Sequence, residues 1–162
     1  MDSNQILRKH LLDLLSGGNA HMPFKAAVAD FPFNAMNNLA PQGDYTPWRL
    51  LEHMRLAQWD ILEFVRNPQY TSPEWPKGYW PAPGQKTDQA GWDETIQKFL
   101  DDLKAFEKIV EDPKTDLLAD IPHAPGYTIL REALLIADHN AYHLGEFAIL
   151  REVMGTWGKN KH

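Results

Sequence analysis

The chain has 162 residues, of which 43% are hydrophobic and 11% aromatic, with a formal net charge of −6 and no cysteine. This length suffices for one packed core, so we expect a single domain over residues 1–162. The absence of cysteine excludes disulfides and thiolate metal sites. The acidic balance argues against a nucleic-acid partner, because the one basic cluster is the tail from Lys159 to His162. No segment resembles a signal peptide or a membrane span, which predicts a cytoplasmic protein without a membrane partner.

The first predicted helix covers residues 4–15. Ser3 is its expected N-cap, and Gly17-Gly18 stops it. One stripe of this helix is apolar and contains Leu7, Leu11 and Leu14. The connection that follows is irregular and proline-punctuated, with one helical turn expected at residues 24–29.

The second predicted helix has a clear start signal. Thr46 is the expected N-cap, and Pro47 occupies the first helical position, where a missing N–H does no harm. The helix continues to about Arg66, because Pro68 prevents further extension. Its apolar residues form two rows, which predicts a helix buried over a wide face.

Two further helices are predicted, at residues 89–111 and from the N-cap Thr128 to about Met154. The stretch between the second and third predicted helices, residues 67–86, contains five prolines and is expected to be non-helical. The first of the two has apolar residues at alternating spacings of four and three, which is typical of a bundle helix. Four amphipathic helices must bury their stripes against one another. We therefore predict an all-α fold, a four-helix bundle with long connections between helices 1 and 2 and between helices 2 and 3.

The last helix carries two histidines four residues apart, His139 and His143. Four residues turn a helical side chain through about 400°, so the two rings share one face, about 6 Å apart at Cβ. This spacing allows both rings to bind one cation, and a half-exposed or hydrogen-bonded pair is the alternative. Two neutral polar rings in the most apolar helix are unfavourable without a shared partner, which favours the metal interpretation.

A third histidine, His53, lies on a largely apolar face of the second helix. Three neutral imidazoles suit zinc, nickel, iron or copper and do not suit calcium or magnesium. We therefore predict a divalent-metal site at His53, His139 and His143. Asn140 stands where a zincin motif has its catalytic glutamate, which argues against metalloprotease chemistry.

Several segments resemble the DinB/YfiT-like superfamily of metal-binding helical bundles, the damage-inducible type and not the DNA polymerase. The matching pieces are Leu51-Glu52-His53-Met54, residues 128–132, residues 138–146, Ala20-His21 and residues 59–80. They extend over nearly the whole chain. The resemblance implies that His53, His139 and His143 bind a divalent metal ion, usually nickel or zinc. It also implies a homodimer.

The resemblance leaves the reaction open. It implies a metal-dependent transferase or hydrolase that acts on a small molecule, with a low-molecular-weight thiol such as bacillithiol or mycothiol as a possible co-substrate. Because the chain has no cysteine, any thiol must come from outside. The alternative is a non-catalytic, stress-associated metal-binding protein whose site is structural or vestigial. The catalytic residues stay unassigned at this point.

Candidate general bases near the histidines are Glu52, Glu132 and Glu146, and each is expected to be an ion-paired or ligand-orienting residue instead. The aromatic residues Trp75, Tyr79 and Trp80 are interpreted as a plug at one end of the bundle, with a lid over the metal as the alternative. His21 is expected to be a hydrogen-bonded loop residue.

Overall fold

The computed structural model describes residues 2–158, and this part of the chain is mostly helical. Its α-helices are α1 (Ser3–Ser16), α2 (Phe24–Val28), α3 (Pro47–Arg66), α4 (Gln89–Glu111) and α5 (Ile129–Val153). Two single 3-10 turns, η1 (Phe33–Ala35) and η2 (Lys77–Tyr79), lie in the connections. The basic cluster noted in the sequence, from Lys159 to His162, lies outside the described residues.

The starts of α3 and α5 confirm the predicted caps. The Thr46 side chain accepts a hydrogen bond from the Arg49 N–H, and Pro47 is the first helical residue. The Thr128 side chain accepts one from the Arg131 N–H. Each cap satisfies a backbone donor that would otherwise have no partner in the first turn, so the local sequence alone fixes where these helices begin.

The start of α1 differs from the prediction. The N-cap is Asp2 and not Ser3, which is the first residue of the helix. The Asp2 carboxylate accepts from the Gln5 N–H, and the Gln5 side chain accepts from the Asp2 N–H, so the two form a reciprocal capping box. The Asp2 carboxylate and the Gln5 side chain each satisfy one backbone donor, and this pair favours Asp2 over Ser3 as the cap.

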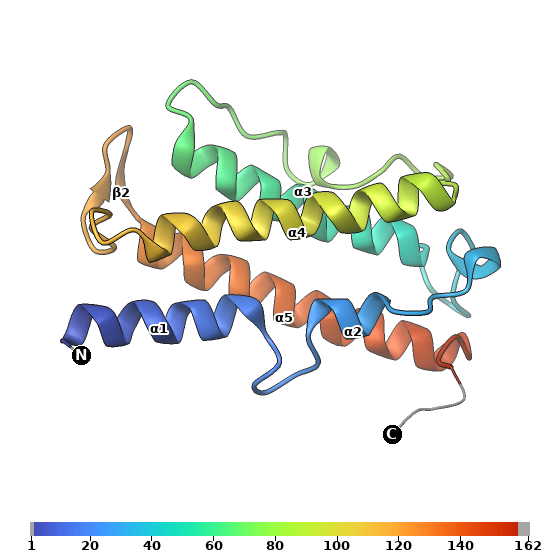
Figure 1. Ribbon diagram of the computed structural model, residues 1–162. Coiled ribbons are helices and arrows are strands. Elements are labelled where there is room, and N and C mark those ends of the chain that lie inside the picture. The colour runs from blue at the N-terminus through green and yellow to red at the C-terminus, as the bar shows by residue number, and fades with distance from the viewer. Residues whose placement is uncertain (1, 159–162) are drawn as a thin grey trace.

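The four long helices α1, α3, α4 and α5 lie lengthwise against one another (Figure 1). Helix α3 packs on α4 and α5, while α1 packs on the same two helices from the other side and α2 continues along α5. The colours in Figure 1 show that α3 and α5 run in opposite directions. Two apolar clusters fill the interior, one containing Leu62, Phe106 and Ile136 and the other Leu51, Phe99 and Phe147.

A short antiparallel hairpin precedes α5 and was not predicted. It consists of β1 (Asp120–Ile121) and β2 (Ala124–Thr128), and it lies at the end of the molecule where α4 finishes (Figure 1). Ile121 is buried there in one of the apolar clusters. Strand β1 has two residues, too few to show the alternating pattern by which strands are recognised, so the hairpin could not be predicted from it.

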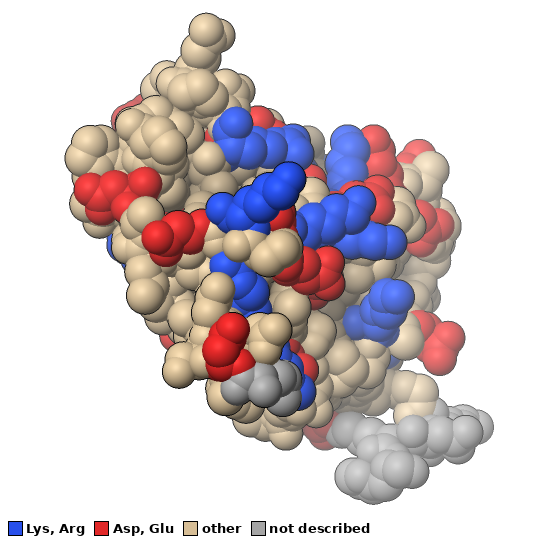
Figure 2. Space-filling view, turned by 60° about the vertical axis from the view of Figure 1, so that its left-hand side comes forward, with Lys and Arg blue, Asp and Glu red and all other residues tan. Residues whose placement is uncertain are grey.

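Charged side chains of both signs mix on the face shown in Figure 2, where Lys and Arg lie beside Asp and Glu. The absence of a nucleic-acid partner stays a prediction. None of the helices in residues 2–158 has the length and apolarity that a membrane crossing requires.

Candidate metal centre

The structure brings the three predicted histidines together. The Nε2 atom of His53 lies 3.2 Å from the Nε2 atom of His143 and 3.2 Å from that of His139. One nitrogen from each ring lies within 4.8 Å of the other two. The meeting follows from the fold: the helical repeat stacks the two rings of α5, and the antiparallel packing of α3 on α5 places His53 opposite them.

Hydrogen bonds at the far side of two rings determine which nitrogen carries the proton. The Nδ1–H of His53 donates to the carbonyl oxygen of Tyr79 at 2.8 Å. The Nδ1–H of His143 donates to Oε2 of Glu146 at 2.5 Å. A carbonyl or carboxylate oxygen can only accept, so in each neutral ring Nδ1 holds the proton and Nε2 presents a lone pair.

With both rings neutral, the lone pairs of His53 and His143 face each other across 3.2 Å. Two facing acceptors repel unless a cation lies between them. Nitrogens that are each about 2.1 Å from one zinc ion are about 3.0 Å apart at a right angle and about 3.4 Å apart at the tetrahedral angle. The observed spacing lies between these values. The donor set thus fits a first-row divalent cation.

Burial keeps two of these rings neutral. The pKa of His53 is lowered from its ordinary value, chiefly because burial disfavours the charged form. Burial, reinforced by the neighbouring histidines, lowers the pKa of His139 to about 3. Both rings are therefore unprotonated at neutral pH, which is the state that binds a metal ion.

The proline-rich connection between α3 and α4 covers His53. The Trp80 ring stacks on the His53 ring with centroids 3.9 Å apart and planes 4° apart. Trp75, in contrast, is 69% exposed, so the prediction that it plugs an end of the bundle was wrong. The reason is that the connection runs back beside α3 (Figure 1). There the Tyr79 carbonyl and the Trp80 ring contact His53, and Trp75 stays in solvent.

Two tyrosines tie this connection to α3. The Tyr79 hydroxyl donates to Oδ2 of Asp60 and the Tyr70 hydroxyl donates to Oδ1, both at 2.9 Å. Asp60 is itself buried, on the same helix as His53. Because the backbone carbonyl of Tyr79 holds Nδ1 of His53, the Asp60–Tyr79 hydrogen bond fixes a partner of the candidate ligand.

Glu146 orients His143 and is not a free base. Its Oε2 accepts from His143, and its Oε1 accepts from the Tyr45 hydroxyl at 2.9 Å. Burial and the hydrogen bond to Glu146 raise the pKa of Tyr45 to about 12, so the hydroxyl stays a donor at neutral pH. The spacing of Glu146 after His143 was a usable sequence signal. Tyr45, in the loop before α3, gave none.

The other candidate carboxylates do not belong to the histidine group. Glu52 pairs with Arg55 at 2.6 Å and accepts from the Thr95 hydroxyl, as its expected ion-paired role requires. Glu132 is buried and pairs with Arg131.

The predictions for His21 and Asn140 can each be compared with one hydrogen bond in the structure. His21 lies at 2.9 Å from the Met22 carbonyl, which confirms a hydrogen-bonded loop histidine. The Nδ2 of Asn140 donates to Oε1 of Gln58 at 2.9 Å, so Asn140 joins α5 to α3. Its amide thus has a structural partner and no role as a base.

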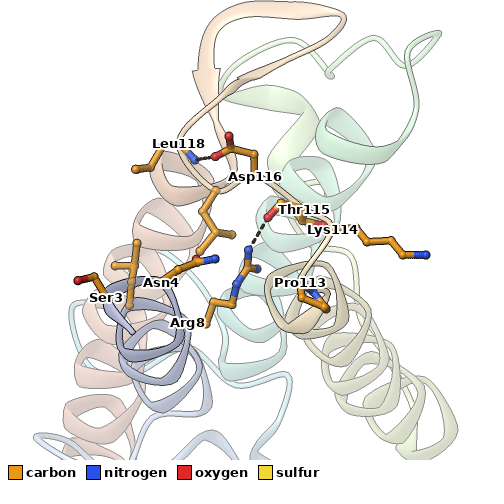
Figure 3. A pocket seen from close by; sticks show the side chains of 10 residues that line it. Ser3, Asn4, Arg8, Pro113, Lys114, Thr115, Asp116 and Leu118 are labelled. Carbon is orange, nitrogen blue, oxygen red and sulfur yellow. Dashed lines mark hydrogen bonds between the residues drawn. The ribbon is translucent and has the colours of Figure 1, made fainter. Parts of the chain in front are cut away.

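A separate cavity of about 470 Å³ lies between the start of α1 and residues 113–118 (Figure 3). Arg8 reaches into this region and donates to the carbonyls of Val110 at 2.6 Å and Thr115 at 2.5 Å. These two carbonyls belong to the last turn of α4 and the segment after it. Arg8 therefore holds the end of α4 in place, and the Lys114 side chain points away from it (Figure 3).

No family model, curated protein or solved structure matches the chain. The functional assignment therefore depends on the geometry of the site and on the sequence resemblance.

Proposed function

We propose that this protein is a divalent-metal-dependent enzyme of the DinB/YfiT-like, four-helix-bundle type, which acts on a small molecule as a thiol-dependent transferase or a hydrolase. The observation that carries the proposal is the convergence of three imidazole Nε2 atoms, two of them with lone pairs that face each other at 3.2 Å. Nickel and zinc are the proposed metals, because a borderline cation with nitrogen ligands fits this donor set.

Three protein ligands are typical of a catalytic metal site, whereas structural zinc sites have four. A cation held by His53, His139 and His143 would supply Lewis-acid chemistry, favouring the deprotonated form of a water or thiol and polarising a substrate carbonyl. The thiol must be exogenous, since the chain has no cysteine.

Other residues of the chain orient the candidate ligands and shield them from water. Tyr79 and Glu146 fix the ring orientation of two ligands by accepting from Nδ1, and such outer partners raise ligand basicity. Trp80 covers one face of the His53 ring and excludes water from it. Both oxygens of Glu146 are engaged, which favours a thiol that needs no protein base over hydrolysis with Glu146 as the base.

The test is an activity assay on zinc-loaded and nickel-loaded protein beside His143→Ala. One arm measures conjugation of a low-molecular-weight thiol to chlorodinitrobenzene, in which sulfur displaces chloride and the thiol proton goes to solvent. The second arm measures hydrolysis of a nitrophenyl ester. Metal-dependent turnover that His143→Ala abolishes is the expected result. Turnover that persists in His143→Ala would contradict the proposal.

The alternative is a non-catalytic metal-binding protein with a structural or vestigial site. Its supporting observation is the close fit of the site into the helix interface, since His53 is only 2% exposed. In that case metal removal lowers the melting temperature and neither substrate is turned over. The two functions therefore predict opposite results in the same assay.

The cytoplasmic location and the homodimer are part of the proposal. An exposed apolar stripe with a spacing of seven residues on α5 supports the dimer, because a second copy would cover it. The stripe contains Leu135, Tyr142 and Ile149. Sedimentation velocity on the purified protein tests the dimer, and a monomer at micromolar concentration would contradict it.

A further inference from the structure

A cavity of about 630 Å³ lies beside the histidine group, and none of the three histidines lines it. Its volume falls in the range of small-molecule sites, about 300–1,000 Å³. Two aromatic rings, two cations and four small or proline residues form its wall, namely Tyr45, Arg49, Pro76, Lys77, Trp80, Pro81, Ala82 and Pro83.

The cavity touches the candidate metal centre through two of these residues. Trp80 stacks on His53 with its ring and also lines the cavity. Tyr45 lines the cavity and donates its hydroxyl to Glu146, the partner of His143. The two rings lie 5.2 Å apart and form the rim between cavity and histidines. A molecule bound in the cavity would thus be separated from the candidate ligands by the thickness of one side chain.

The charge of the wall is opposite to that of the chain. Arg49 and Lys77 line the cavity and no acidic residue does, although the chain has a net charge of −6. Within the described part of the chain, the Arg49 guanidinium donates to the backbone carbonyls of Pro81 and Asp44. Among residues 2–158, neither cation is paired with a carboxylate, so their positive charge is available to a ligand.

We propose that this cavity binds the substrate of the metal centre, and that the substrate is a small anion with an apolar or aromatic body. The carboxylate or phosphate group pairs with Lys77 and Arg49, while the body packs on Trp80 and the prolines. The inference rests on the proposed function for the link to the metal, whereas binding of the anion itself does not require a metal.

The experiment is a fluorine NMR titration of the full-length protein with para-trifluoromethylbenzoate. Its neutral amide, para-trifluoromethylbenzamide, serves as the matched probe of equal shape. We expect the benzoate to bind about fivefold more tightly than the amide, the upper range for a solvent-exposed ion pair. Lys77→Gln should remove most of that difference, whereas Lys86→Gln, on the same connection and outside the cavity wall, should leave it unchanged. Ala82→Trp should fill the cavity and weaken both probes.

Equal affinity for the two probes in the wild-type protein would overturn the anion assignment. An equal effect of Lys77→Gln and Lys86→Gln would overturn the location. Cobalt-loaded protein tests the link to the metal, because a bound probe near the paramagnetic ion shows a shifted fluorine signal. Binding without that shift overturns the link. Failure of the protein to take up cobalt counts against the proposed function instead, and the titration of metal-free protein still decides whether the cavity binds anions.

Discussion

Two groups of polar side chains interrupt the packing of α3 on α5, and they differ in how their nitrogen and oxygen atoms are satisfied. In the amide bridge, Gln58 donates to the Phe99 carbonyl at 2.7 Å and accepts from Asn140. In the histidine group, the hydrogen bonds of His53 and His143 lead outward, to Tyr79 and Glu146, and leave Nε2 lone pairs facing inward.

The difference separates a structural polar group from a candidate metal site. The amide bridge joins three helices through bonds between its own members and the backbone, so Gln58 needs no ligand. The histidine group directs the Nε2 lone pairs of His53 and His143 at one point. Burial of facing acceptors is unfavourable, and a cation removes the penalty. The first two changes below each break one of these groups, the third alters a partner of the histidine group, and the last concerns a carboxyl outside both.

The largest effect is expected from His139→Ala. Removing one of three nitrogen ligands should weaken zinc binding by more than about 100-fold, beyond the loss expected for an outer partner. Competition against a chromophoric chelator measures the affinity. His21→Ala is the matched control, because that ring contacts the Met22 carbonyl and is not one of the three grouped histidines. Equal affinity of wild type and His139→Ala would show that the metal binds elsewhere.

Breaking the amide bridge should affect stability and not the metal. Gln58→Leu leaves the Phe99 carbonyl and the Asn140 Nδ2 without their buried partner, which should lower the free energy of unfolding by about 2 kcal/mol. Urea unfolding of the metal-free protein gives this value. The folded variant should still bind one zinc per chain. Loss of zinc binding in a folded Gln58→Leu would mean that the two groups are not separate.

The hydrogen bonds to Asp60 offer a finer comparison. Tyr79→Phe and Tyr70→Phe each remove one hydroxyl from the same carboxylate, but only Tyr79 also holds His53 through its carbonyl. We expect Tyr79→Phe to weaken zinc binding about tenfold and Tyr70→Phe to leave it near wild type. The optical spectrum of cobalt-loaded protein should change in Tyr79→Phe alone. An equal loss of zinc affinity in both variants would show that Asp60 stabilises the fold in general and does not position His53.

The smallest effect concerns Glu132, a buried carboxyl outside both groups. Burial raises its pKa above the ordinary value, so the folded state favours the protonated form. Its charge therefore destabilises the fold at pH 7 and stops doing so below about pH 4.5, where it is protonated in the unfolded chain too. Glu132→Gln should raise the melting temperature at pH 7 and have little effect at pH 4. A gain of the same size at both values would rule out this cause.

The parts of the molecule that sequence predicts well are those fixed by neighbours in the chain. Thr46 and Pro47 set the start of α3, and Thr128 sets that of α5, within a single turn. His139 and His143 were paired by helical spacing. His53 could be added because a histidine on a mostly apolar face is unusual, and its partners were correctly anticipated even though α3 and α5 are far apart in the chain.

The parts that sequence did not predict depend on contacts without a repeating pattern. The Tyr79 carbonyl meets His53 across 26 residues, and Tyr45 meets Glu146 across 101. Every residue type carries a backbone carbonyl, so a hydrogen bond to one cannot be recognised from the residue types. A proline-rich connection has no periodicity from which its path along α3 can be derived. The stacking of Trp80 on His53 was missed for the same reason.

The most direct test of the central claim is anomalous scattering at the zinc absorption edge from crystals grown with equimolar zinc. We expect one peak about 2.0–2.1 Å from the Nε2 atoms of His53, His139 and His143. A map with no peak between these three rings, while zinc is bound at another position, would contradict it.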